Sequence, residues 1–274
     1  MSKLYVMGTP IGNLGDFSPR AVETLEKCDF IAAEDTRVTL KLLNHFGIKK
    51  NMVSYFEHNK RERGEMILSR ILAGESCVLV TDAGMPAISD PGEDLVKLCH
   101  ENGVKVESVP GPCAFATALA ISGMPSGRFT FEGFLSVNKP GRTEHLLSLK
   151  NETRTMIFYE APHKLGATLK DMNKAFGNRE IAIVRELTKI HEEVIRTTLD
   201  DAAKKYGDGG IKGEIVLIIK GAEPEAEEEM TFEKAVEYAE KSVENGMSVS
   251  EAAKQTAKLT GYKKGDIYKK LIGE

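Results

Sequence analysis

Short apolar runs alternate with amphipathic segments through the first third of the chain. The apolar runs predict strands at 4–7, 30–33, 52–55, 77–80 and 104–109. The segments between them carry apolar residues at helical spacing and predict helices at 20–27, 36–46, 61–72 and 95–99. Ser18 and Pro19 suit the cap and the first residue of the first helix. This alternation is typical of a mostly parallel sheet covered on both faces.

The pattern changes near residue 112. A helix of small residues at 114–121 is followed by apolar runs at 129–134, 155–159, 181–184, 194–198 and 215–219. Short connections or a single helix separate the last three runs, which predicts a mixed sheet with some antiparallel pairing. We therefore expect an N-terminal α/β domain at 1–112 and a second α/β domain at 113–221.

The last part of the chain is helical in pattern. An acidic linker at 222–230 precedes amphipathic segments at 231–244, 248–259 and 265–272. Thr231 and Ser248 are expected caps, and Glu251 is placed as in a capping box. The tail at 231–274 is thus predicted to form three helices that resemble a helix-turn-helix. Its lysines between 254 and 270 favour nucleic acid binding, with a solvated helical face as the alternative.

Composition limits the classes of protein that are possible. Of 274 residues, 41% are hydrophobic and 28% are charged, as in soluble globular proteins. We expect no membrane span and no signal peptide, because apolar runs are short and the chain starts in a strand. The net charge of −4 excludes nucleic acid binding by global charge but allows a local basic groove. The widely spaced cysteines predict reduced thiols and a cytoplasmic location: Cys28, Cys77, Cys99 and Cys113.

Several common catalytic motifs are absent from the sequence. It has no GxGxxG after the first strand, no GxxxxGK[ST] and no GxSxG. The segment that begins at His191 starts like HExxH but lacks the second histidine, and no metal is predicted. This favours a reaction in which the co-substrate is already activated and the protein positions and desolvates the reactants.

The loop at 80–92 is the strongest local sign of a ligand site. It holds two glycines, two prolines and two carboxylates between a predicted strand and a predicted helix. Strand-to-helix loops are commonly only about 2–6 residues long, and α/β proteins bind ligands at the carboxyl ends of their strands. The alternative is a purely structural turn.

Together with this loop, further motifs occur in a recognisable order. They lie at 8–16 (GTPIGNL and Asp16), 33–37 (AEDTR), 54–59, 81–92, 110–112, 132–135 (EGFL), 159–165 (YEAPHKL), 185–189 (RELTK) and 212–214 (KGE). In this order the chain resembles the bacterial 16S ribosomal RNA 2'-O-methyltransferases of the tetrapyrrole methylase family (class III). The resemblance covers residues 3 to about 220 and extends to the tail. Met85 departs from it, since the family more often has threonine there.

The resemblance implies a fold and a reaction. It implies two α/β domains of tetrapyrrole methylase type, with S-adenosylmethionine folded into the cleft between them, and a small C-terminal helical domain. It implies that the methyl acceptor is a cytidine ribose in 16S rRNA of the small ribosomal subunit, and that the protein is a homodimer.

The resemblance also places residues around S-adenosylmethionine. Asp82 would lie beside it, or would only cap the following turn, and Met85 and Ile88 would form an apolar wall. Free N–H groups near Cys113 would meet its polar end. The full set is Pro10, Asp82, Ala83, Gly84, Met85, Ile88, Cys113, Ala114, Phe134, Pro162, Leu187 and Gly213.

A ribose hydroxyl needs a group that accepts its proton. The candidates all follow predicted strands: Asp16, Glu34, Asp35 and His58. Glu34 and Asp35 could instead form a structural ion pair with Arg37, and the sequence does not choose a base. Candidate RNA phosphate contacts are Arg37, Lys60, Arg61, Arg63, Lys139, Arg142 and Lys164, although exposed basic residues are common.

Two other functions stay open at this point. One is a small-molecule methyltransferase that acts on a tetrapyrrole ring, against which the AEDTR motif, the pair His58 and Asn59 and the basic tail argue. The other is a non-catalytic RNA-binding assembly factor. Methyl transfer to small ribosomal subunits separates the three.

Overall fold

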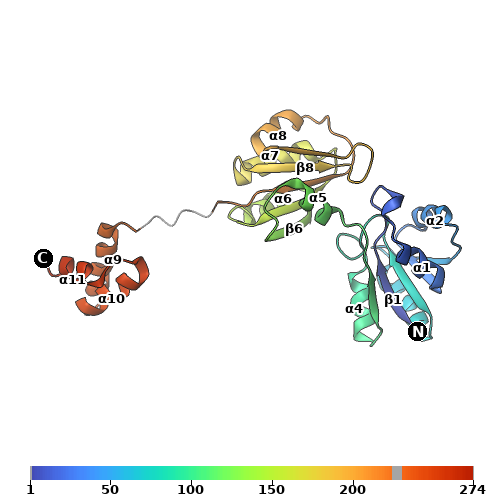
Figure 1. Cartoon of the computed structure of the whole chain (residues 1–274), viewed down its shortest axis with the longest axis horizontal. Helices are drawn as coiled ribbons and strands as arrows, with labels where there is room; N and C mark the ends of the chain where they lie inside the picture. Colours follow the sequence, from blue (N-terminus) through green and yellow to red (C-terminus); the bar gives the residue numbers. More distant parts are fainter. Residues whose placement is uncertain (1, 224–229, 274) are drawn as a thin grey trace. The chain divides into compact units, whose positions relative to one another are not determined.

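The computed structural model describes residues 2–223 and 230–273. It divides into two compact units, Met1–Ala222 and Glu223–Glu274, each described here by itself. Most of the acidic linker predicted at 222–230 lies outside the described residues. Figure 1 shows the first unit in blue to orange and the helical unit in red.

The first sheet is entirely parallel. Its strands are β1 (Lys3–Met7), β2 (Phe30–Ala33), β3 (Asn51–Ser54), β4 (Ser76–Val80) and β5 (Val106–Val109), in the order β3-β2-β4-β1-β5. Its helices are α1 (Pro19–Lys27), α2 (Thr36–His45), α3 (Lys60–Leu72) and α4 (Glu93–Glu101), with a short 3-10 helix, η1 (Leu14–Asp16). The predicted parallel sheet is confirmed, and Ser18 caps α1 by accepting the Ala21 N–H at 3.1 Å.

Helices cover both faces of this sheet. Leu25 of α1 and Leu43 of α2 pack on one face, and Ile67 of α3 and Leu95 of α4 pack on the other. The neighbouring strands β1 and β4 therefore lead to helices on opposite faces. Such a switch point opens a crevice at the carboxyl ends of the strands, where α/β proteins bind ligands.

The second sheet is mixed, as predicted. It holds β6 (Phe129–Phe134), β7 (Thr155–Glu160), β8 (Glu180–Arg185), β9 (Glu193–Thr198) and β10 (Ile215–Ile219), in the order β6-β7-β10-β8-β9. Only β6 and β7 pair in parallel among these strands; the other pairs are antiparallel.

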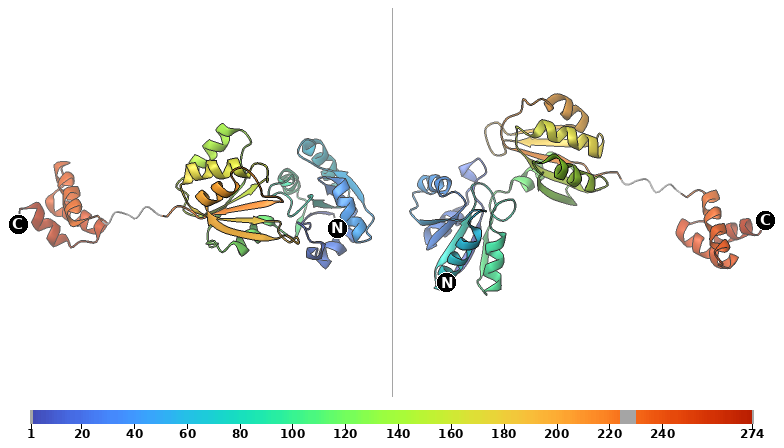
Figure 2. Two further views of the ribbon diagram at one scale, coloured as in Figure 1. Left: turned by 90° about the horizontal axis from the view of Figure 1, so that it is seen from above. Right: turned by 180° about the vertical axis from the view of Figure 1, so that it is seen from behind.

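Four helices accompany the second sheet: α5 (Ala114–Ser122), α6 (Lys139–Ser148), α7 (Leu165–Phe176) and α8 (Leu199–Tyr206). Residues of α5 pack on one face, and apolar side chains of α6, α7 and α8 pack on the other. Figure 2 shows the yellow α7 and the orange α8 on the same face of this sheet. Both α6 and α7 go beyond the predicted elements, although Leu165, Leu169, Met172 and Phe176 of α7 have helical spacing.

The helical unit consists of α9 (Phe232–Glu244), α10 (Val249–Thr260) and α11 (Lys264–Leu271). Its small core contains Ala239, Ala253 and Ile267. Ser248 caps α10 by accepting the Glu251 N–H at 3.3 Å, and its hydroxyl donates to the Glu251 carboxylate. The predicted three helices are confirmed. None of the helices among the described residues is both long and apolar enough to cross a membrane.

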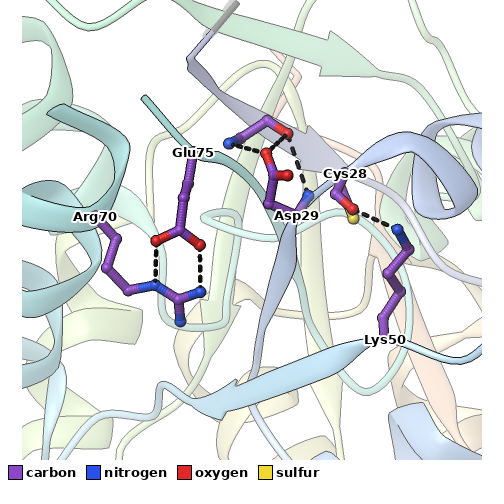
Figure 3. A network of polar contacts seen from close by, with 6 residues as sticks. Cys28, Asp29, Lys50, Arg70 and Glu75 are labelled. Atoms are coloured by element: carbon purple, nitrogen blue, oxygen red, sulfur yellow. Dashed lines mark hydrogen bonds and ion pairs between the residues drawn. The ribbon is translucent and has the colours of Figure 1, made fainter. Parts of the chain in front are cut away.

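A polar network ties together the amino ends of strands in the first sheet (Figure 3). The Asp29 carboxylate accepts the Ser76 N–H at 2.6 Å and the Ser76 hydroxyl at 2.7 Å. Nearby, the Arg70 guanidinium is paired with Glu75 and lies over the Phe30 ring. These contacts join the segments that lead into β2 and β4, so they hold the register of the two strands.

Candidate active site

Two loops at the carboxyl edge of the first sheet are joined by backbone hydrogen bonds. The Thr9 N–H donates to the Gly84 carbonyl at 2.9 Å, and the Gly84 N–H donates to the Thr9 carbonyl at 3.1 Å. The loop after β1 also packs against the loop after β5, since a Cβ on Gly8 would lie 2.7 Å from the Gly111 Cα. Side chains larger than glycine do not fit at this contact.

Beside this bridge lies a cavity of about 380 Å³, formed by residues from both sheets. Its apolar wall includes Ile11, Met85, Ile88, Leu187 and Val216. The charged residues that line it are all acidic: Asp90, Glu160 and Glu214. Ligand sites usually measure about 300–1,000 Å³ and combine a mostly apolar lining with a few polar groups. This cavity has the size and the lining of such a site.

Most residues predicted to surround the co-substrate line this cavity. They are Ala83, Gly84, Met85, Ile88, Cys113, Ala114, Phe134, Pro162 and Leu187. Pro10 and Asp82 instead line a neighbouring cavity of about 280 Å³ with Thr9, Gly12 and Thr81. Gly213 precedes Glu214 of the lining and has a φ of +92°, and a Cβ there would meet the Glu186 side chain at 2.4 Å.

Sequence reasoning did not single out several lining residues: Ile11, Ser89, Asp90, Tyr159, Glu160, Ala161, Glu214, Ile215 and Val216. A signal was present for some of them. Asp90 is the second carboxylate of the loop at 80–92, and Tyr159 to Ala161 belong to the YEAPHKL motif. Ile215 and Val216 were visible only as residues of an apolar strand.

Tyr159 fixes the start of α5 at the cavity. Its hydroxyl accepts the Phe115 N–H at 3.1 Å, and its ring lies against Phe131 and Phe134. Burial raises the pKa of Tyr159 to about 12, so the phenol stays protonated at neutral pH. Burial also raises the pKa of the neighbouring Cys113 thiol. Both groups are therefore neutral parts of the lining.

The Asp35 carboxylate makes two structural contacts. It caps α2 by accepting the Arg37 N–H at 2.8 Å, and it pairs with the Arg37 guanidinium at 2.6 Å. Hydrogen bonds from Arg37 lower the pKa of Asp35 to about 2. The structure therefore favours the ion-pair interpretation for Asp35, because so acidic a carboxyl is a weak base at neutral pH.

Glu34, Thr81, Asp82 and Asp90 lie together at this edge. The buried Thr81 hydroxyl donates to Glu34 Oε2 at 2.6 Å, and the Asp82 N–H approaches the same oxygen at 3.3 Å. The Asp35 N–H donates to Asp82 Oδ1 at 3.1 Å. Burial, with added repulsion from Glu34, raises the pKa of Asp82 and of Asp90. Raised carboxyl pKa values in a cleft are typical of functional sites.

The two remaining base candidates are exposed and do not line the cavity. Asp16 ends η1, and His58 lies just before α3 with its ring edge against Phe56.

The candidate RNA-binding side chains differ in their exposure and in the ion pairs that they form. Arg61, Arg63 and Lys139 are exposed, and the Arg37 side chain is 87% exposed despite its pairing. Lys60 bridges Glu57 and Asp94, both at 2.8 Å, and Lys164 is half-buried where α7 begins. Arg142 is only 14% exposed and pairs with Asp171 at 2.8 Å, so it joins α6 to α7.

Comparison with known proteins identifies this architecture. A family model described as Tetrapyrrole (Corrin/Porphyrin) Methylases matches residues 3–203. The chain belongs to the tetrapyrrole methylase family. A family member from Synechocystis, named Ribosomal RNA small subunit methyltransferase I, is 45% identical over 269 residues. These cover 98% of this chain and 96% of that protein. The predicted family and fold class are thereby confirmed.

Two further tetrapyrrole methylases match about four fifths of the chain. A Thermotoga maritima protein, also named Ribosomal RNA small subunit methyltransferase I, is 45% identical over 223 residues, which are 81% of this chain and all of the relative. The unmatched share has the size of the helical unit. The solved structure of uroporphyrin-III C-methyltransferase from Thermus thermophilus, complexed with S-adenyl homocysteine, covers 80% of this chain and 97% of its own. Its TM-score of 0.55 at 18% identity shows the shared fold.

Proposed function

We propose that the protein transfers a methyl group from S-adenosylmethionine to the ribose 2'-hydroxyl of a cytidine in 16S rRNA of the small ribosomal subunit. The observation that carries the proposal is the similarity over nearly the whole chain to proteins named Ribosomal RNA small subunit methyltransferase I. The cavity of about 380 Å³ supports it from the structure.

The lining fits S-adenosylmethionine. When bound, this group supplies a methyl already activated by a positively charged sulfur. The charged side chains around the cavity are carboxylates, which favour a cation. Lys189 offsets one of them, because it pairs with Glu214 at 3.0 Å as well as with Glu186. The apolar wall of Met85, Ile88 and Leu187 suits an aromatic base and excludes water.

The chain's own contribution is alignment. The bridge between Thr9 and Gly84 holds two cavity loops in register, and Tyr159 holds the start of α5. Glu160 is held by the Ala161 N–H at 2.8 Å and the Thr168 hydroxyl at 2.5 Å, which fixes the turn that leads to Pro162. A rigid, largely apolar site lowers the barrier mainly by fixing the reacting groups in line and by excluding water.

RNA binding is assigned to basic side chains on two parts of the molecule. Arg37, Arg61, Arg63 and Lys139 present exposed charges on the first unit, and Lys60 and Lys164 are half-buried there. The lysines between 254 and 270 lie on or beside α10 and α11. Deletion of 223–274 should leave S-adenosylmethionine affinity unchanged, weaken RNA binding most at low salt and make its salt dependence shallower, because phosphate contacts are lost. A salt series that matches the full-length protein would remove the tail from this role.

We also propose that the protein acts as a homodimer in the cytoplasm. Exposed apolar side chains at Phe134, Val137 and Leu147 provide surface that a second copy would cover. Its cysteines are free thiols, as in proteins of a reducing compartment. Sedimentation of the purified protein tests the dimer, and a monomer at micromolar concentration would contradict it.

The decisive experiment is methyl transfer to purified 30S subunits from labelled S-adenosylmethionine, with mass spectrometry of the RNA. The expected product is a single ribose-methylated cytidine. A methyl group on a base would contradict the assigned acceptor. Absence of transfer to RNA, with transfer to a tetrapyrrole, would instead support the small-molecule alternative, and no transfer at all would support a binding factor.

A further inference from the structure

We propose that the smaller cavity, of about 280 Å³, holds the cytosine base of the acceptor nucleotide, and that Asn13 and Asp82 recognise the hydrogen-bonding edge of this base. The inference rests on the proposed methyl transfer and deepens it, because it names a site that selects cytidine over uridine.

The smaller cavity shares a wall with the larger one. Thr9 lines the smaller cavity, and the residue to which it is bridged, Gly84, lines the larger one. Asp82 and Ala83 divide in the same way, and the Cα atoms of consecutive residues are only about 3.8 Å apart. In a nucleotide the ribose is bonded directly to the base. A base in the smaller cavity therefore brings its ribose to the wall behind which the proposed co-substrate lies.

The size and the apolar lining of the smaller cavity suit a single base. Its volume lies just below the range of about 300–1,000 Å³ that is usual for larger ligands. Pro10, Leu14, Val38 and Leu42 contribute apolar surface to it. Leu14 is 43% exposed and Val38 is 36% exposed, so water reaches two aliphatic side chains at this site. A planar ring that covers them removes apolar surface from water, which favours its binding.

Two polar side chains of the lining each have one atom held by the backbone and one atom left for a ligand. Asn13 Oδ1 accepts the Gly15 N–H at 2.9 Å, which leaves the Nδ2 group to donate. Asp82 Oδ1 accepts the Asp35 N–H at 3.1 Å, which leaves Oδ2 to accept. Among the described residues, no cation forms an ion pair with Asp82. The cavity thus offers one oriented donor and one oriented acceptor.

This pair matches the edge of cytosine. Cytosine presents its N4 amino group, a donor, beside N3, an acceptor, and carboxylates commonly accept from N4. Asp82 can accept from N4 while Asn13 donates to N3. Uracil reverses the pattern, because it presents the O4 acceptor beside the N3–H donor. Its O4 would face a carboxylate and its N3–H would face an amide N–H, so the same two residues reject uracil.

Lys41 adds a charge without base selection. It lies on α2, lines the same cavity and is exposed. None of the ion pairs among the described residues engages it. A lysine ammonium is a point charge that suits a phosphate, whereas phosphate contacts carry no sequence information. We therefore assign Lys41 to the backbone of the acceptor strand and not to its base.

The main test exchanges the donor and the acceptor. Methyl transfer is measured on 30S subunits with the acceptor cytidine, located by mass spectrometry of the wild-type product, and on reconstituted 30S subunits in which uridine replaces it. The wild type should prefer cytidine by about 10- to 100-fold in kcat/KM. The double variant Asn13→Asp with Asp82→Asn presents the reversed hydrogen-bonding pattern and should prefer uridine.

Each single variant leaves one contact mismatched. Asn13→Asp and Asp82→Asn should each lower kcat/KM for cytidine by about tenfold and change S-adenosylmethionine affinity by less than about threefold. Both keep the oxygen that accepts a backbone N–H, so the loops stay folded. Asn44→Asp is the matched control, because Asn44 is exposed on α2 and lines neither cavity, and it should retain wild-type values.

Lys41→Ala separates the phosphate contact from the base contacts. It should lower kcat/KM for the cytidine and the uridine substrates equally, and it should make RNA affinity less dependent on salt. A changed preference between the two bases would move Lys41 into the base-reading set and would contradict the division of roles.

A second measurement needs no reaction. The side-chain ¹⁵N amide signals of Asn13, assigned by their loss in Asn13→Asp, should shift when cytidine 5'-monophosphate is added and shift less with uridine 5'-monophosphate. S-adenosyl homocysteine, present at saturation in the larger cavity, should not abolish the shift.

The outcomes separate this inference from the proposed function. An unchanged preference for cytidine in the double variant, or equal shifts of the Asn13 signals with the two nucleotides, would overturn the base-reading site while leaving the methyl transfer intact. A wild-type protein that methylates no small-subunit RNA would overturn the proposed function itself.

Discussion

The two edges of the first sheet carry the same chemical pair in two different settings. At the amino edge, Asp29 accepts the hydroxyl of Ser76 at 2.7 Å. At the carboxyl edge, Glu34 accepts the hydroxyl of Thr81 at 2.6 Å. In both pairs the residues are 47 positions apart, because β2 and β4 lie side by side in one register. One strand pair thus ends in a carboxylate and a hydroxyl at each edge.

What surrounds each pair decides what it does. At the amino edge, hydrogen bonds from Ser76 lower the pKa of Asp29, and pairing with Arg70 lowers that of Glu75. At the carboxyl edge, burial and neighbouring carboxylates raise the pKa of Asp82 and Asp90. Satisfied charges stabilise a fold, whereas crowded carboxylates store unfavourable energy that a reaction can use. The comparison teaches that carboxylates satisfied by hydrogen bonds and carboxylates crowded by one another lie at opposite ends of the same strands.

The largest effect is expected at the close backbone contact between the loops that follow β1 and β5. Gly111→Ala would place a Cβ 2.8 Å from the Gly8 carbonyl oxygen. The backbone must shift, which should cost about 1–3 kcal/mol of folding free energy and weaken co-substrate binding. Chemical denaturation and calorimetry measure the two losses.

Gly127→Ala is the matched control, because a Cβ there meets open space and should cost little. Equal stability of the two variants would show that the carboxyl edge tolerates movement.

A smaller change in the free energy of unfolding should have opposite signs at the two edges of the sheet. Asp29→Asn should lower the free energy of unfolding at pH 7 by about 1 kcal/mol, because charge-assisted hydrogen bonds are lost. Since the pKa of Asp29 is lower in the folded protein, its contribution is present above the unfolded value of about 3.9 and is lost as pH falls through the folded value. The deficit should therefore disappear in strong acid.

Asp90→Asn should instead raise the free energy of unfolding at pH 7. The raised pKa of Asp90 means that its charged form penalises the folded state, so the penalty grows as pH rises from about 4 through the folded value. The variant should gain a small amount of stability at pH 7, by about 1–2 °C in thermal midpoint, and none near pH 3. Thermal scans across pH check both variants, and equal signs at pH 7 would contradict the contrast.

The smallest effect on stability is expected for Arg37→Ala. Its ion pair with Asp35 is exposed to solvent, so its loss should leave the free energy of unfolding nearly unchanged. RNA affinity should fall with a shallower salt dependence, since one phosphate contact is removed. A clear loss of stability with unchanged RNA affinity would reassign Arg37 to the fold.

Much of this architecture was predictable, because strands and helices leave periodic patterns. The parallel and mixed sheets follow from apolar runs such as 77–80 and 215–219, and the Gly- and Pro-rich loop at 80–92 marks the cavity. The pairing of residues 47 positions apart was not predictable, since it depends on which strands become neighbours. The role of α7 was missed even though its apolar spacing is regular.

The sequence also did not reveal which cavity each residue of the loop at 80–92 lines. Asp82 faces the smaller cavity, whereas Ala83 and Asp90 face the larger one. Between them the backbone takes positive φ values at Gly84 and Ala87, of +87° and +63°. These turns redirect the chain, so a residue's position in the motif does not reveal which cavity it lines.

The bridge between Thr9 and Gly84 has a thermodynamic consequence. Its two strands of backbone form a single partition, with Thr9 and Asp82 toward one cavity and Ile11 and Gly84 toward the other. Because the same backbone walls both cavities, a movement that admits a ligand to one cavity also moves the wall of the other. If a ligand bound in one cavity changes the affinity of the other cavity for a second ligand by some factor, the second ligand must change the affinity for the first by the same factor. The two peptide hydrogen bonds of the bridge are the contact through which such a coupling would pass.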